Sequence, residues 1–213
     1  MLTILDYAGV AVFAATGALA ASRQQLDPIG FLFFAAMTGI GGGTIRDLVL
    51  GQRPVFWVEN PAYVLVCASV AGLVFFTAHL IESRYRLLLW LDAIGLAAYC
   101  VMGAAKGYDA SGSAAVAIVA GAMTATFGGI LRDVLSEEPS VLMRPEIYVT
   151  AAMLGAAVFM LATTLGAPLW LAALGGAASA FALRGGALIY GWRIPSYRPR
   201  PGRAQDESLK KGP

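Results

Sequence analysis

The sequence is poor in charge, in cysteine and in histidine. Only 13% of its 213 residues are charged, against roughly 25% in soluble proteins, while 58% are hydrophobic and the mean hydropathy is +0.70. This composition disfavours a soluble enzyme, a disordered protein and a nucleic-acid-binding protein. It favours a polytopic membrane protein, because a helix that spans a bilayer needs about 20 predominantly apolar residues.

Reactive side chains are scarce, which argues against most catalytic and metal-binding sites. Cys67 and Cys100 lie in apolar runs and form no Cys-x-x-Cys pattern, so neither a disulfide framework nor a zinc or redox motif is available. His79 is the single histidine, and the sequence has no Gly-x-Ser-x-Gly motif. We therefore predict that the protein is not an enzyme and holds no metal or cofactor, apart from permeating ions and at most a bound lipid.

Seven apolar runs are long enough to cross a bilayer as helices. Short polar segments separate them, among them 51–60 and 106–112, which we expect to be loops. The 25 glycines are typical of transmembrane helices that pack closely through small side chains. The sequence thus predicts an all-α polytopic membrane protein with seven transmembrane helices, over residues 5–22, 28–50, 61–81, 87–105, 113–135, 146–165 and 167–190.

Basic residues are distributed unevenly around these spans. If the N-terminus lies outside, the cytoplasmic loops and the tail hold ten of them, whereas the outside loops hold only Arg53 and Lys106. This distribution follows the positive-inside rule. We therefore expect a multi-pass protein with its N-terminus outside and its C-terminus cytoplasmic. Since we find no eukaryotic targeting signal, we expect a bacterial inner membrane.

An internal repeat relates the first part of the chain to the second. When residues 5–47 are compared with residues 91–133, an offset of 86, twelve positions are identical. Matches of alanine and glycine arise easily by chance in membrane helices, but polar matches do not. The polar matches that carry the repeat are Asp6 with Asp92, and Arg46-Asp47 with Arg132-Asp133.

Each repeat holds three spans, so the second repeat must enter the membrane from the opposite side. Such inverted repeats recur in transporters, where the functional path runs at the interface between the repeats. The predicted organisation is a first three-helix repeat over 1–86, a second, inverted repeat over 87–165, a closing seventh helix over 166–192 and a disordered basic cytoplasmic tail over 193–213.

Two glycine clusters lie in the second and fifth spans. Gly41, Gly42 and Gly43 follow Thr38, and Gly128 and Gly129 follow Thr124. Glycine costs about 1 kcal/mol relative to alanine inside a helix, so the clusters predict a kink or an unwound turn whose freed carbonyls would face a water-filled path. The alternative is close helix–helix packing through small residues, and the two interpretations are compatible.

A pair of opposite charges follows each glycine cluster. Arg46 and Asp47 end the first motif, and Arg132 and Asp133 end the second. Charges inside a span are costly and are usually paired or functional. Because adjacent residues of a helix do not face each other, we expect each of these four side chains to find its partner elsewhere, across the repeats or on freed carbonyls. The alternative is that they lie at helix ends and reach the lipid headgroups.

Four further charged residues are secondary candidates. Asp6 and Asp92 open the first and fourth spans, where we expect them to cap helices, with pore lining or a partner contact as the second possibility. Lys106 follows the fourth span at the outer face, where it would attract or repel permeating ions. Arg184 lies two turns before the end of the seventh span and would reach inward or bind a lipid phosphate.

The duplicated motif resembles the prokaryotic branch of the trimeric intracellular cation channels. Residues 41–47 fit the GGGxxRD pattern of that family in full, and residues 127–133 fit it with Phe127 in place of the first glycine. The resemblance implies a homotrimer in which each subunit has its own pore, bounded by kinked spans two and five and conducting K+ and, less well, Na+. Animal members have Lys-Glu-Val at the second cluster and use it with inositol lipids, whereas Phe127-Gly128-Gly129 stands here.

Two functions are therefore compatible with the sequence. The first is a passive channel for monovalent cations, K+ over Na+, with membrane lipids around it. No TVGYG-type filter is present, so discrimination between the two ions should be modest. The second is a secondary transporter of a small zwitterion such as glycine, because the same family is also described as a glycine transporter. A half-helix that begins after Gly43 would bind the carboxylate in that case.

Overall fold

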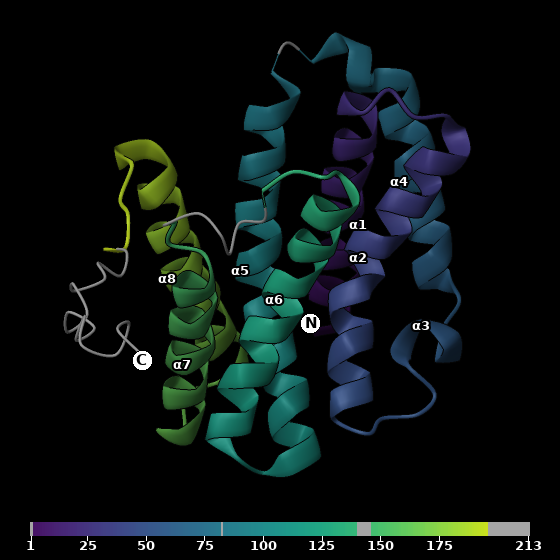
Figure 1. Ribbon diagram of the computed structural model, residues 1–213. Coiled ribbons are helices and arrows are strands. Elements are labelled where there is room, and N and C mark those ends of the chain that lie inside the picture. Colours follow the sequence, from purple (N-terminus) through teal and green to yellow (C-terminus); the bar gives the residue numbers. More distant parts are fainter. Residues whose placement is uncertain (1, 82, 140–145, 196–213) are drawn as a thin grey trace, which may run out of the picture.

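The computed structural model describes residues 2–81, 83–139 and 146–195, and these residues are folded almost entirely into helices (Figure 1). In chain order the elements are α1 (Leu2–Arg23), α2 (Pro28–Val49), α3 (Phe56–Glu59), α4 (Ala62–Thr77), η1 (Ala78–Leu80), α5 (Arg84–Ser111), α6 (Ala114–Leu135), α7 (Val149–Thr164) and α8 (Leu169–Tyr190).

Seven of these helices correspond to the seven predicted spans. Six are long and apolar enough to cross a membrane, and the seventh, α7, is an apolar helix of 16 residues. The predicted fold class is therefore confirmed. Of the predicted tail, only 193–195 fall within the described residues.

Two predicted loops are wrong in part. The segment 51–60 contains the short helix α3, and α5 continues through most of 106–112 to Ser111. Lys106 therefore lies inside a helix and not in an outer loop. The polar residues at this end of α5 form its last two turns, and the helix stops only where Gly112 adopts a left-handed φ of 65°.

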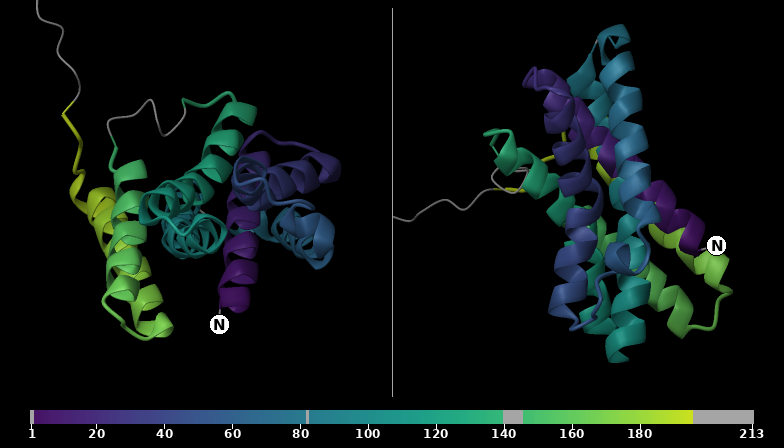
Figure 2. Two further views of the ribbon diagram at one scale, coloured as in Figure 1. Left: turned by 90° about the horizontal axis from the view of Figure 1, so that it is seen from below. Right: turned by 90° about the vertical axis from the view of Figure 1, so that its right-hand side faces the viewer.

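The two halves of the chain run in opposite directions. Figure 1 shows α1 rising from the N-terminus, whereas its counterpart α5 descends, and the same inversion relates α2 to α6 and α4 to α7. Helices α1, α2 and α4 pack together, as do α5, α6 and α7, and α8 lies against α5 and α7. Seen from below in Figure 2, α7 and α8 lie on one side, α1, α2 and α4 on the other, and α5 and α6 between them.

Reciprocal contacts join the two halves. A side chain added at Gly9 of α1 would strike the ring of Tyr99 on α5, and one added at Gly95 of α5 would strike the ring of Phe13 on α1. The two rings stack with their centroids 5.2 Å apart. The offset of 86 converts one contact into the other. The interface of α1 and α5 thus contains two equivalent contacts, each made by the same pair of duplicated positions.

Local sequence explains where the functional helices begin. Asp27 accepts a hydrogen bond from the backbone N–H of Gly30 at 2.7 Å, and Pro28 starts α2. Ser113 plays the same capping part for α6 by accepting from Val116. Large apolar side chains such as Phe33 are exposed on the outer surface, as expected for helices that face lipid.

Candidate functional site

Helices α2 and α6 cross at their glycines. A Cβ atom at Gly42 would lie 2.5 Å from the carbonyl oxygen of Thr124, and one at Gly128 would clash with the carbonyl oxygen of Thr38. Both helices are continuous, so the predicted unwound turn with freed carbonyls is wrong, whereas the predicted kink stays a prediction. The glycines are needed because only a residue without a side chain lets two backbones approach so closely, which is the packing alternative.

The neighbouring motif residues line the same crossing. Gly41 lies beside the side chain of Leu131 on α6. Thr124 is buried and donates to the carbonyl oxygen of Ala120 at 2.6 Å, whereas the hydroxyl of the buried Thr38 has no partner within the described residues. The Thr38 hydroxyl faces α1, since a Cβ at Gly17 would lie 2.6 Å from it, so this oxygen lies beside the crossing and is free to bind water or an ion.

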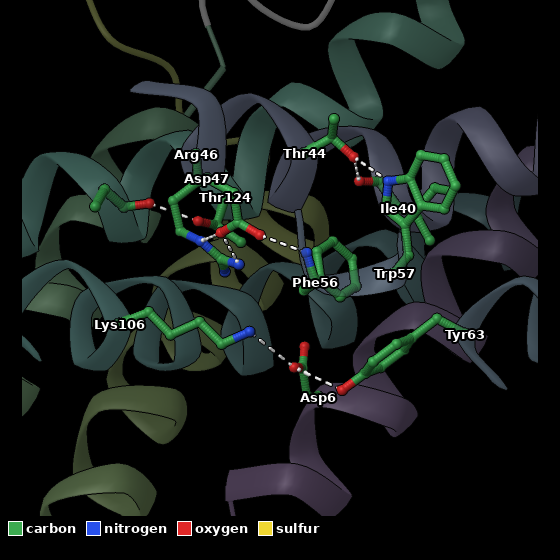
Figure 3. Close-up of polar contacts among 11 residues, drawn as sticks. Asp6, Ile40, Thr44, Arg46, Asp47, Phe56, Trp57, Tyr63, Lys106 and Thr124 are labelled. Atoms are coloured by element: carbon green, nitrogen blue, oxygen red, sulfur yellow. Dashed lines mark hydrogen bonds and ion pairs between the residues drawn. The ribbon is translucent and has the colours of Figure 1, made fainter. Parts of the chain in front are cut away.

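The first charge cluster surrounds Arg46 (Figure 3). Its guanidinium donates to Oδ1 of the adjacent Asp47 from Nε at 2.8 Å and from Nη2 at 2.6 Å. Oδ2 of Asp47 accepts from the backbone N–H of Phe56 at 3.0 Å, which holds the start of α3 against α2. Gly43 gives the Phe56 ring its place, because a Cβ there would lie 2.7 Å from that ring.

The expectation that these side chains find their partners away from the neighbouring residue is wrong for Arg46 and holds only in part elsewhere, since Arg132 also binds Asp92 on α5 and Asp47 also accepts from the backbone of Phe56. Arg46 binds Asp47, and Arg132 binds Asp133 through Nη2 at 2.8 Å and Nε at 3.0 Å. All four side chains are buried, so they do not reach the headgroups either. The Cβ atoms of adjacent residues do diverge, but the arginine side chain is long enough to fold back along its own helix.

Asp6 joins three helices at the same end of the molecule. Its Oδ2 accepts from the hydroxyl of Tyr63 on α4 at 3.0 Å and from Nζ of Lys106 on α5 at 3.1 Å (Figure 3). The predicted capping role is wrong, since α1 begins at Leu2 and Asp6 is buried in its second turn. Partner contact, the second possibility, is what the structure contains. The Lys106 ammonium also lies 5.1 Å from the centre of the Phe56 ring.

The second cluster surrounds Asp92 on α5. Its Oδ1 accepts from Nη1 of Arg132 at 2.9 Å and from the hydroxyl of Tyr148 at 3.3 Å. Gly129 makes room for this arrangement, because a Cβ there would lie 2.5 Å from the Tyr148 hydroxyl. Asp92 is only 1% exposed and eight residues into its helix, so it does not cap α5 either. Its Oδ2 has no partner within the described residues.

Arg184 is buried beside this cluster and not extended toward lipid. Its Nη1 donates to the Glu146 carboxylate at 2.9 Å and to the carbonyl oxygen of Ile147 at 3.2 Å. Its guanidinium carbon lies 5.1 Å from the centre of the Tyr148 ring. The closing helix α8 is thereby tied to the segment that leads into α7. At 1% exposure, Arg184 cannot bind the phosphate of a surrounding lipid.

The two clusters are related by the repeat but differ in one charge. Each contains an acid bonded to a tyrosine, and each stands next to an Arg-Asp pair. Arg132 bridges Asp92 and Asp133, whereas the bond to Asp6 comes from Lys106. The position equivalent to Lys106 in the first half is Ala20.

Several partners of the charged residues were not predicted from the sequence. Tyr63, Tyr148, Phe56 and Glu146 were not among the candidate residues, although the first two occupy matching places at the start of the third span in each repeat. The signal available in the sequence was a tyrosine at the start of the third span of each repeat, together with an acid in the first span of the same repeat. Nothing local indicates Phe56, because its role depends on how the loop after α2 folds back.

A mostly apolar cavity lies beside the first cluster. It measures about 260 Å³, lies between the end of α2 and the start of α6, and has Arg46 in its wall beside residues such as Val49 and Val119. A smaller cavity of about 10 Å³ near the second cluster is lined by Arg132, Asp133 and Ser136 among others. Within residues 2–81, 83–139 and 146–195, no group of three or more His, Cys, Asp or Glu residues could hold a metal ion.

Comparison with known proteins identifies the family. A family model described as "Glycine transporter" matches residues 3–79 and again residues 89–164. The trimeric intracellular cation channel orthologue of Rhodobacter sphaeroides is 53% identical in sequence, and its structure superposes with a TM-score of 0.88 over 90% of this chain and 98% of its own. The chain belongs to the trimeric intracellular cation channel family, also designated UPF0126.

Two further relatives support this family assignment. A prokaryotic channel of the family, solved in 0.5 M KCl, is 26% identical with a TM-score of 0.82 over 91% of this chain and 98% of its own. The UPF0126 inner membrane protein YadS of Escherichia coli is 38% identical over 198 residues, 91% of this chain and 94% of the relative. The structural relatives are described as channels and not as enzymes, in agreement with the sequence prediction.

Proposed function

We propose that the protein is a homotrimeric channel for monovalent cations in a bacterial inner membrane, with a separate path through each subunit. The observation that carries the proposal is the pair of buried charge clusters, one associated with each half, that flank the crossing of α2 and α6. Charged side chains inside membrane helices are costly, and they commonly mark the route of an ion.

The chemistry of the path favours cations. At the second cluster, two carboxylates, Asp92 and Asp133, share the guanidinium of Arg132. In the part of the chain that the structure describes, the side-chain oxygens buried without a partner are Asp92 Oδ2, Thr38 Oγ1 and Ser136 Oγ. Oxygens of this kind are ligands for water and for K+ or Na+. We therefore propose that the path follows α2 and α6 beside their glycines, with Thr38 and Thr124 near its centre.

Selectivity between K+ and Na+ should be modest. Strong discrimination needs a ring of carbonyl oxygens, and both glycine helices keep their carbonyls in the helix. Side-chain oxygens and water would then coordinate the ion, with K+ favoured over Na+ because it gives up its hydration more readily. Channel names among the relatives support cation conduction and a trimer, and an inner-membrane name supports the location. The distribution of basic residues supports an outside N-terminus.

The glycine-transporter alternative loses its structural basis. It required a half-helix that begins after Gly43 and offers its N-terminus to a carboxylate. Helix α2 instead runs unbroken from Pro28 to Val49, so no helix N-terminus faces the interior there. The name of the family model is then the remaining support for a carrier, and no arrangement within the described residues favours one.

Recording from purified protein in planar bilayers tests the proposal. We expect unitary ohmic currents in KCl, smaller currents in NaCl, and a reversal potential in a KCl gradient close to that of a cation-selective pore. Asp92→Asn should lower the K+ conductance, whereas Asp109→Asn, an equal change of charge at an exposed position near the end of α5, should leave it within error. Silent bilayers combined with saturable glycine uptake into vesicles would overturn the channel in favour of the carrier.

A further inference from the structure

A cavity between the start of α5 and the end of α8 lies apart from both charge clusters. It measures about 440 Å³ and is lined by Ser83, Tyr85, Arg86, Leu89, Trp90, Leu188 and Ile189. Its size falls within the range of roughly 300–1,000 Å³ that is typical of small-molecule sites. Neither the proposed ion path nor any residue of the duplicated motif uses it.

The lining of the cavity changes from polar to apolar along α5. Ser83 and Arg86 are exposed at the beginning of the helix, and Leu89 and Trp90 follow one turn later. Residues three, four and seven positions apart share a helix face, so a charged end and an apolar wall face the same space. The described lining residues include a cation and no acid. A ligand that matches this lining has a negative group at one end and a hydrocarbon portion at the other.

Among the described residues of this corner, Arg86 differs from the other arginines in having no partner. Arg84 donates to the carbonyl oxygens of Ala78 and Ser22, and Arg23 pairs with Glu138. Within residues 2–81, 83–139 and 146–195, Arg86 has no hydrogen bond or ion pair, and its side chain is exposed. A guanidinium with all its donors available binds a phosphate oxygen pair in a bidentate manner.

The cavity also lies at the ends of two helices that are long and apolar enough to cross a membrane. It is bounded by the first turns of α5 and the last turn of α8, where two spans end. Trp90 lines it, and Tyr190 and Trp192 stack on each other just past its wall with ring centroids 5.5 Å apart. Tryptophan and tyrosine side chains concentrate at the membrane–water interface, where spanning helices end. Ile189 is 64% exposed, so the apolar wall is open to surrounding lipid.

We infer that this cavity binds one anionic phospholipid, with its phosphate on Arg86 and Ser83 and an acyl chain between Leu89, Trp90 and Ile189. Phosphatidylglycerol has the required chemistry, a phosphodiester of net negative charge joined to acyl chains. Zwitterionic phosphatidylethanolamine carries the same phosphate, but its positively charged ammonium group repels the guanidinium of Arg86. The site is independent of conduction, because it shares no residue with either charge cluster.

Native mass spectrometry of the purified, delipidated protein tests the site, with phosphatidylglycerol or phosphatidylethanolamine added to the micelles. We expect the protein to retain phosphatidylglycerol in preference. Arg86→Gln should weaken that binding about fivefold, since one basic residue near an anionic surface contributes on the order of 1 kcal/mol. Ile189→Trp, which fills the apolar wall without a change of charge, should weaken the binding of both lipids.

The matched control is Arg53→Gln, the same change at an exposed arginine in the loop between α2 and α3. It should leave phosphatidylglycerol binding at the parental level. The inference is overturned if Arg86→Gln binds like the parent, if Arg53→Gln loses as much lipid, or if the two lipids bind equally. Since Arg86 and Ile189 are both exposed, their replacement should not unfold the protein, and an unchanged elution volume would verify this.

Discussion

The crossing of α2 and α6 predicts the effect of a single methyl group. In Gly42→Ala the new Cβ would lie 2.5 Å from the carbonyl oxygen of Thr124 and 3.2 Å from the backbone nitrogen of Gly128. Both are backbone atoms of a helix, so neither can rotate away as the end of a side chain could. The two helices must therefore separate by a fraction of an ångström, and the contacts along their interface loosen.

The magnitude follows from a comparison with the same change where space is available. A Cβ at Gly72 of α4 meets nothing within 4 Å. Gly72→Ala should therefore gain only the helix propensity of alanine, about 1 kcal/mol. Gly42→Ala has the same gain but adds overpacking, which costs about 1–3 kcal/mol. The free energy of unfolding of Gly42→Ala should thus lie about 1–3 kcal/mol below that of Gly72→Ala.

Unfolding by SDS in mixed micelles, followed by helical circular dichroism, measures this difference. Gly128→Ala repeats the test from the other helix, because its Cβ meets the carbonyl oxygen of Thr38. The combined variant Gly42→Ala/Gly128→Ala should cost less than the sum of the two, since one separation relieves both clashes. Equal stability of Gly42→Ala and Gly72→Ala would refute the close crossing.

Three further substitutions test the polar network. Arg132→Gln leaves two buried carboxylates without their cation and should lower the free energy of unfolding by about 3–5 kcal/mol; a loss below about 1 kcal/mol in SDS titration would contradict a buried pair. Lys106→Gln should raise the K+ conductance in bilayers more at 10 mM than at 1 M salt, and an equal change at both would exclude an electrostatic cause. Trp57→Phe removes the 2.9 Å bond to Thr44 and should speed hydrogen exchange in α3, whereas unaltered exchange would argue that this bond does not hold α3.

The helices and their inverted repetition could be predicted from sequence because both signals are local or duplicated. Hydropathy located seven apolar helices, and the Arg-Asp motif aligned the halves without knowledge of their packing. Helix ends were predicted less well. The last two turns of α5 contain Lys106 and Asp109, which look like a loop in a hydropathy pattern, although the helix simply extends past the apolar core.

The partners of the charged residues could not be predicted from spacing. Asp6 and Asp92 were expected to cap helices, yet α1 and α5 begin earlier and carry both acids into the interior. Arg46 and Arg132 were expected to bind distant groups, yet each folds back onto the next residue, although Arg132 binds the distant Asp92 as well. In both cases the deciding quantity was the three-dimensional path of the chain or of a flexible side chain, which a linear motif does not contain.

Duplication has produced two similar clusters that are held together differently. The Asp92 cluster obtains its cation, Arg132, from its own repeat, whereas the Asp6 cluster obtains Lys106 from a helix of the opposite repeat. Lys106 is also the more accessible of the two cations, at 27% exposure of its side chain against 3% for Arg132. Under the proposed function, an ion would therefore meet different electrostatic fields at the two ends of its path. One end has an accessible ammonium, and the other has a carboxylate oxygen of Asp92 that no described residue binds.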